Sequence, residues 1–362
     1  MIRWRSGVVA SRGRAWSGAV ELVVRVDRGA EVRALAYPAL VGDPQPGDRV
    51  LVNATTLELG LGTGGYAMVV ALPDRLPPDP PRAPGHMVKA RYTPLQAVVL
   101  GVDEQESEHH AVLRDADDLA GMPVVVADLH SALPAVLAGI RADAPGLRVV
   151  YVATDGGALP LWFSQAVDGL RGAGWLAGTV TAGQAYGGDL EAVTLHTGLL
   201  AARLVLAADI AIVAQGPGNL GTDTRWGFSG VACGEAVNAA AVLGGRPVAA
   251  LRVSGADRRE RHRGVSHHSL TAYGRVALAP ADVVLPVLDG PLAELGALLS
   301  AQAAALTPPH RLIDVGVDGL AEALAQSPVG LSTMGRGLAD DPAAFLASAA
   351  AGRHAAVLAS AG

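Results

Sequence analysis

The run Val124-Val125-Val126-Ala127 is apolar throughout, and it ends at the polar segment Asp128-Leu129-His130-Ser131. Short apolar runs rich in β-branched residues are typical of strands buried on both faces of a sheet. Similar runs recur along the chain, mostly separated by segments of helical character. This alternation predicts a mostly parallel, Rossmann-like α/β sheet with helices on both faces. The other predicted strands are 97–100, 149–153, 178–181, 210–214, 247–253, 283–287 and 312–315, and the predicted helices are 130–142, 158–170, 190–207, 229–243, 291–306, 320–326 and 342–360.

The first part of the chain has a different pattern. Short segments of β character at 20–26, 31–37, 49–52 and 66–71 are separated by tight-turn sequences, which predicts a small all-β, barrel-like domain over residues 1–72. Six prolines follow in the fourteen residues from Leu72 to Gly85. Proline-rich segments continue neither sheet nor helix, so we expect a linker at 73–90 and the α/β domain at 91–362.

Composition limits the functional class. The chain has 362 residues, of which 50% are hydrophobic and 17% charged, so it has enough apolar residues to fold around a substantial core. Its net charge of −6 argues against a large nucleic-acid interface. Charged residues interrupt the long apolar runs, and no signal peptide is evident, so we expect a cytoplasmic protein that does not enter the membrane. Cys233 is the one cysteine, which excludes an intramolecular disulfide and a cysteine-rich metal site.

Polar residues follow several of the predicted strands. In a parallel sheet the carboxyl ends of the strands lie along one edge, where ligands bind, so these residues are the first candidates for a site. Asp128 and His130 follow one strand and Asp155 follows the next, and the spacing of the first two suits an acid-base pair or ligands of a divalent cation. An alternative for His130 is a capping role on the following helix.

A glycine-rich loop follows the strand at 210–214. Its sequence Gly216-Pro217-Gly218-Asn219-Leu220-Gly221-Thr222 precedes a helix predicted to begin near Ser229. Backbone N–H groups and a helix N-terminus attract anions, which predicts a phosphate or carboxylate site. An ordinary turn is the alternative, because the sequence lacks the P-loop lysine and the acidic partner of a dinucleotide site. The predicted anion ligands are Gly216, Gly218, Asn219, Gly221, Thr222, Thr224 and Ser229.

Histidines and arginines are concentrated after the strand at 247–253. His262, His267 and His268 are candidates for metal binding or acid-base catalysis, with a solvent-facing helix N-terminus as the alternative for the last two. Arg259 and Arg261 belong to an arginine-rich run that could grip an anion or pair with nearby acids.

Three longer strings carry a resemblance to a known family. They are GTVTAGQAYGGDLEAV from Gly178, IVAQGPGNLGTDTRWGFSG from Ile212 and RRERHRGVSHHSL from Arg258. They resemble the bacterial DUF3866 family, and the likeness extends over nearly the whole chain. The resemblance implies no particular reaction.

Taken together, these residues predict a hydrolase or group transferase for a small anionic metabolite, phosphorylated or nucleotide-like. A divalent metal is compatible with its histidines and carboxylates, and its identity stays open. The alternative is a non-catalytic ligand-binding or regulatory protein whose N-terminal barrel contacts a protein or nucleic-acid partner. The sequence is also compatible with a homo-oligomer.

Overall fold

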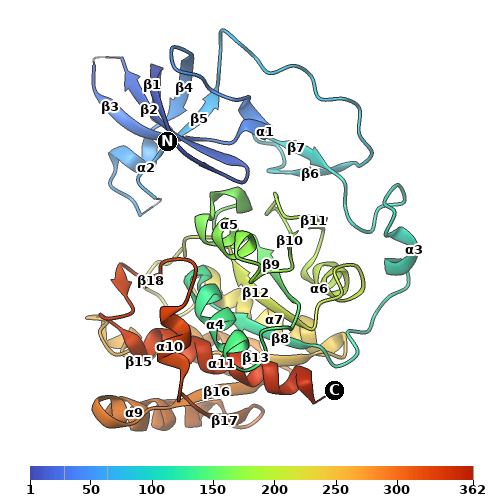
Figure 1. The fold of residues 1–362 in the computed structure, drawn as a ribbon, viewed down its shortest axis with the longest axis vertical. Coiled ribbons are helices and arrows are strands. Elements are labelled where there is room, and N and C mark those ends of the chain that lie inside the picture. Colours follow the sequence, from blue (N-terminus) through green and yellow to red (C-terminus); the bar gives the residue numbers. More distant parts are fainter. Residues whose placement is uncertain (28, 63, 362) are drawn as a thin grey trace. The chain divides into compact units, whose positions relative to one another are not determined.

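The computed structural model describes residues 1–27, 29–62 and 64–361, and Figure 1 shows its elements. Two compact units divide the chain. The barrel unit comprises Met1–Val99 together with Trp162–Asp168, and the sheet unit comprises Leu100–Leu161 and the described residues from Gly169 onward. The proline-rich stretch 73–84 has neither helix nor strand and is exposed.

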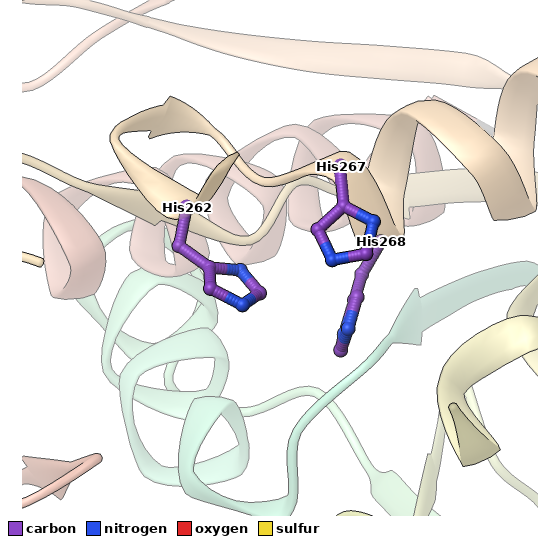
Figure 2. A group of neighbouring side chains, drawn as sticks. All are labelled: His262, His267 and His268. Carbon is purple, nitrogen blue, oxygen red and sulfur yellow. The ribbon is translucent and has the colours of Figure 1, made fainter. Parts of the chain in front are cut away.

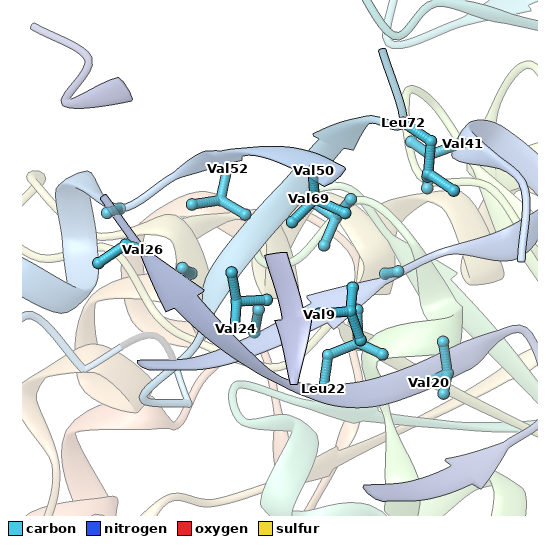
Figure 3. Close-up of a cluster of buried hydrophobic side chains, with 14 residues drawn as sticks. Val9, Val20, Leu22, Val24, Val26, Val41, Val50, Val52, Val69 and Leu72 are labelled. Carbon is cyan, nitrogen blue, oxygen red and sulfur yellow. The ribbon is translucent and has the colours of Figure 1, made fainter. Parts of the chain in front are cut away.

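Five strands close into a barrel in the first unit, as the sequence predicts. They are hydrogen-bonded in the order β1-β2-β3-β5-β4, and β1 also pairs with β4. Buried valines of β1, β2, β4 and β5 fill the interior, including Val9, Val24, Val50 and Val69 (Figure 3), and β3 contributes alanines. Because alternate side chains of a strand point inward, a valine-rich β pattern suffices to specify this core. The elements are β1 (Trp4–Trp16), β2 (Ala19–Val26), β3 (Glu31–Ala36), α1 (Pro38–Val41), β4 (Arg49–Asn53), α2 (Thr55–Glu58) and β5 (Ala67–Ala71).

An aromatic cluster on the outside of the barrel includes a segment from much later in the chain. Trp162 packs against Tyr37, and Phe163 meets Tyr66 edge to face. The Trp16 indole N–H donates to the carbonyl oxygen of Trp162 at 2.6 Å. Gly18 packs directly against the Trp162 side chain, and a Cβ at this position would lie only 2.3 Å from the Trp162 ring. We call this cluster the aromatic clasp.

Strand order β1-β2-β3-β5-β4, with β3 parallel to β5, is that of an OB-type barrel. Trp16 is the last residue of β1, and Gly18 lies in the two-residue connection to β2.

Limited proteolysis tests the linker and the clasp together. We expect cleavage within 73–84, after which the barrel fragment stays bound to the remainder through Trp162 and Phe163. Trp162→Ala should weaken this association by about 3–5 kcal/mol, the cost of truncating a large aromatic side chain. Trp4→Ala removes an exposed tryptophan and serves as the control. Size-exclusion chromatography of the cleaved proteins would contradict the clasp if the wild-type fragments separated as readily as those of Trp162→Ala.

A small ribbon completes the barrel unit. β6 (Met87–Lys89) and β7 (Ala97–Val99) pair antiparallel with each other. The prediction that 97–100 is a strand of the parallel sheet is therefore wrong, because this run pairs locally.

Eight parallel strands form the sheet of the second unit, which confirms the predicted fold class. Their order is β11-β10-β9-β12-β8-β13-β16-β17. The chain starts at β8, runs outward to β11, and returns to β12 before continuing on the other side of β8. This reversal makes the carboxyl ends of β12, β8 and β13 the expected ligand-binding position. The strands are β8 (Pro123–Ala127), β9 (Val149–Thr154), β10 (Gly178–Ala182), β11 (Leu190–Ala192), β12 (Ile210–Gln215), β13 (Arg246–Ala250), β16 (Asp282–Val287) and β17 (Arg311–Gly316).

Helices cover both faces of this sheet, since right-handed crossovers in opposite directions place them on opposite sides (Figure 1). α4 and α11 cross very closely: a Cβ at Gly139 would lie 1.9 Å from the carbonyl oxygen of Ala349, and one at Gly352 would lie 2.0 Å from that of Val136. The helix predicted at 190–207 is shorter than expected, because β11 occupies its start. The helices are α3 (His110–Leu113), α4 (Leu133–Asp143), α5 (Gln165–Gly172), α6 (Leu195–Leu204), α7 (Ala232–Val242), α8 (His267–Thr271), α9 (Ala293–Ala303), α10 (Leu320–Ala325) and α11 (Pro342–Ser360).

Two more ribbons lie in the connections of the sheet unit. β14 (Val253–Ser254) pairs with β15 (Gly264–Val265), and β18 (Ser332–Thr333) pairs with β19 (Arg336–Gly337). Among the described residues, no helix has the length and apolar character needed to cross a membrane.

Candidate metal centre

Asp128 lies at the centre of the sheet edge, directly after β8, and is buried. Its Oδ2 is 3.0 Å from Nδ1 of His268 and 3.1 Å from a guanidinium nitrogen of Arg252. Its Oδ1 accepts a hydrogen bond of 3.1 Å from the Asn219 amide. The carboxylate thus joins the loops that follow β8, β12 and β13.

Burial alone would raise the pKa of Asp128. The hydrogen bond from His268 and the positive charge of Arg252 outweigh burial and hold its pKa below the ordinary value. Nδ1 of His268 lies 3.0 Å from both Asp128 Oδ2 and a guanidinium nitrogen of Arg252. Because that guanidinium also donates to Asp128, and an ionised carboxylate is the stronger acceptor, we assign the Nδ1 proton of His268 to the bond with Asp128. This tautomer leaves the lone pair of Nε2 on His268 available to a ligand.

The β14–β15 ribbon and helix α8 position the histidines. Residues 255–263 connect the two strands and end in a single turn, Glu260–His262. Ser266 caps α8 by accepting from the backbone N–H of His268, and its hydroxyl lies 2.7 Å from Nδ1 of His262. Ser266 is fully buried, which makes it a poor nucleophile and a suitable anchor. One buried hydroxyl therefore fixes both the helix start and the His262 ring.

His262, His267 and His268 turn their rings toward one another (Figure 2). One ring nitrogen from each lies within 4.8 Å of the other two. Phe228 stacks on the His268 ring at 3.8 Å between centroids, with 8° between the planes. Tetrahedral coordination with metal–nitrogen bonds of ~2.0–2.1 Å places ligand nitrogens roughly 3.3 Å apart. The limit of 4.8 Å lies above this value, so a bound ion would draw the three rings closer together.

The electrostatic surroundings favour neutral imidazoles. Burial lowers the pKa of His262 to about 3, and the positive charges of Arg252 and Arg259 act in the same direction. Burial also lowers the pKa of His267, with a further contribution from His268. Metal ions bind the neutral form of histidine, so both rings are in the binding form at neutral pH.

Comparison with known proteins places the chain in a family. A family model described as "Protein of unknown function (DUF3866)" matches residues 33–352. The chain belongs to the DUF3866 family. The match includes most of β3, all of β4 and β5, and every residue of the candidate metal centre, in agreement with the resemblance seen in the sequence. No curated protein matches the sequence.

Two predicted site residues of this DUF3866 protein have other partners. His130 lies 3.1 Å from the hydroxyl of Tyr151, and burial lowers its pKa to about 4. Asp155 is exposed and accepts from the backbone N–H of Gln184 at 2.9 Å, beside a turn at Gly183. The geometry therefore pairs Asp128 with His268, whereas the sequence suggested Asp128 with His130.

The glycine-rich loop is only partly arranged as an anion cradle. The N–H groups of Leu220 and Thr222 donate within the loop, to Ser229 Oγ and to the carbonyl oxygen of Gly227. Gly216 allows a close backbone approach, since a Cβ there would lie 2.4 Å from the carbonyl oxygen of Ala158. Gly218 has φ +93°, which favours glycine as a turn residue. These features support the turn interpretation, because two donors that the cradle requires are already used.

The remaining predicted residues of this loop hold its shape. The hydroxyl oxygens of Thr222 and Thr224 are 3.3 Å apart and share a hydrogen bond. Gly221 forms an isolated antiparallel β-bridge with Phe228. Ser229 donates to the Asn219 side chain at 3.0 Å. The loop thereby positions Asn219 against Asp128 and Phe228 against His268.

Both predicted anion-binding arginines are paired with carboxylates. Arg259 makes two side-chain hydrogen bonds to Asp257, of 3.0 and 2.8 Å. Arg261 pairs with Asp223 at 2.7 Å. The structure thus contains the pairing with nearby acids, and anion binding by these two arginines stays a prediction.

Sequence reasoning missed four residues around the site. Arg252 lies two residues after the end of β13, and this position at a strand end could have identified it as a site residue. Phe228 and Ser266 act through tertiary contacts that no local pattern reveals. Gly230 lies against Asp128, where a Cβ would come within 1.7 Å of Oδ1.

Proposed function

We propose that this DUF3866 protein is a metal-dependent hydrolase for a small anionic substrate, with its metal held by His262, His267 and His268. The observation that carries the proposal is the convergence of three ring nitrogens within 4.8 Å, one of them on a histidine backed by a buried carboxylate. A carboxylate behind a ligating histidine fixes the orientation of the ring and strengthens it as a ligand.

The number of ligands distinguishes catalysis from a structural role. Structural zinc sites use four protein ligands, whereas catalytic sites use three and leave a position for water or substrate. The group of histidines found among the described residues provides three. When bound, a zinc-like ion would acidify a water and polarise the bond to be broken.

The chain's own residues have distinct tasks in this proposal. His268 is oriented by Asp128, and His262 is oriented by Ser266. Phe228 covers one face of the His268 ring and limits access of water from that side. Arg252 neutralises Asp128, so the carboxylate remains ionised behind its histidine.

Reconstitution tests this function. The protein is stripped with EDTA, reloaded with Zn²⁺, Mn²⁺ or Co²⁺, and assayed with p-nitrophenyl phosphate, bis-p-nitrophenyl phosphate and p-nitrophenyl acetate. We expect metal-dependent hydrolysis of at least one ester, its loss in His262→Ala, and its retention in His196→Ala, which changes an exposed histidine on α6. Hydrolysis that needs no metal would overturn the proposal. Metal binding without hydrolysis would instead support the non-catalytic alternative.

A further inference from the structure

An arginine-lined cleft of about 560 Å³ adjoins the segment that leads to His262. Its walls are residues 256–259 from the β14–β15 connection, residues 334–336 near the β18–β19 ribbon, and Asp340. The carbonyl oxygen of Arg259 accepts from the backbone N–H of His262 at 2.9 Å. The wall of the cleft is therefore continuous with the turn that positions the first histidine.

Two of the three arginines in this cleft are fixed by buried acids. Arg259 is bound to Asp257, as described above. Arg336 lies 3.2 Å from Asp341 and 3.3 Å from Asp257. Asp257 and Asp341 are 7% and 1% exposed, so these charges are largely satisfied inside the protein.

Arg258 differs from both. It is exposed and lines the cleft, and within residues 1–27, 29–62 and 64–361 its side chain has no ion pair or hydrogen bond. The lining contains three guanidinium groups and two carboxylates, and Asp341 behind Arg336 is a third carboxylate, so the charges balance and Arg258 is the guanidinium not held by one of these acids. A guanidinium whose hydrogen-bond donors are not used inside the protein is suited to bind an oxyanion through charge-assisted hydrogen bonds.

We propose that this cleft binds an oxyanion of the substrate, a phosphate or carboxylate group, and that Arg258 is its principal ligand. This inference rests on the proposed function, because it assigns the anionic part of the substrate to the cleft and the reacting bond to the histidines. It also replaces the anion ligands predicted from sequence, Arg259 and Arg261, which are paired with Asp257 and Asp223.

Anion binding by metal-free protein tests the cleft separately from catalysis. We would titrate the protein with inorganic phosphate, and separately with acetate, by isothermal titration calorimetry at constant ionic strength. EDTA is present so that neither anion can bind through a metal. We expect Arg258→Ala to weaken binding at least tenfold, the effect of losing a charge-assisted hydrogen bond. Arg275→Ala is the matched control, because Arg275 is exposed, its side chain makes no hydrogen bond or ion pair among the described residues, and its loss changes the net charge equally.

The outcomes separate the cleft from the function. Tenfold weaker binding in Arg258→Ala alone supports the cleft, and a preference for phosphate over acetate, or the reverse, identifies the substrate's anionic group. Equal effects of the two variants, or no binding of either anion to the wild type, would overturn the cleft. If phosphate binding depends on Arg258 but no ester is hydrolysed after metal loading, the cleft stands and the proposed hydrolase function fails.

Discussion

Alanine at His262 is expected to lower the affinity for a divalent metal by roughly 100-fold or more. Loss of an outer-shell partner already costs 10–100-fold in metal affinity, and loss of one of three ligands should cost at least as much. His262 is buried and held by Ser266, so no other histidine can take its position without moving the turn at Glu260–His262.

Competition between the protein and a chelator of known zinc affinity measures this effect. The exposed His196→Ala variant should bind zinc as tightly as the wild type. Melting curves recorded in EDTA show whether His262→Ala is folded without metal, which separates lost ligation from lost structure. Wild-type zinc affinity in a folded His262→Ala protein would contradict a three-histidine centre.

Alanine at Asp128 is expected to destabilise the metal-free protein by about 3–5 kcal/mol. Its removal leaves the Arg252 guanidinium, whose side chain is 10% exposed, without a carboxylate. The same change should lower zinc affinity 10–100-fold, because His268 loses the partner that orients it. Urea unfolding in EDTA and zinc competition measure the two effects independently.

A second substitution distinguishes these roles of Asp128. Adding Arg252→Met to Asp128→Ala removes the unpaired charge, so much of the stability should return while zinc affinity remains low. If the double variant recovers zinc affinity as well, Asp128 acts through stability alone and does not orient His268. If Asp128→Ala is as stable as the wild type, the buried ion pair has been misassigned.

The fold was largely predictable because its strands have strong local patterns. All of Pro123–Ala127 is buried, as a parallel strand covered on both faces requires, and apolar residues alone specify that. The run 97–100 has the same composition but forms a ribbon, because local sequence does not determine which strand is the partner. The aromatic clasp was missed for the same reason, although adjacent Trp162 and Phe163 stand out in a chain with 4% aromatic residues.

The sequence could predict at which edge of the sheet the candidate site lies, but not which side chains there bond to one another. Topology brings Asp128 and His268 together from 140 residues apart, and a strand-end rule identified both. The choice between partners was not predictable. His130 bonds Tyr151, Arg259 bonds Asp257, and Arg258 has no such bond within the part of the chain that the structure describes, because burial and side-chain rotamers decide these contacts. Neighbouring residues of identical chemistry can therefore have different roles.

X-ray absorption at the zinc K edge tests the central claim most directly, on protein reconstituted with one equivalent of zinc. The three-histidine centre predicts three imidazole nitrogens at ~2.0–2.1 Å and one oxygen in the open position, with one imidazole fewer in His262→Ala. A spectrum that shows zinc surrounded by oxygen alone, or one identical in the wild type and His262→Ala, would contradict it.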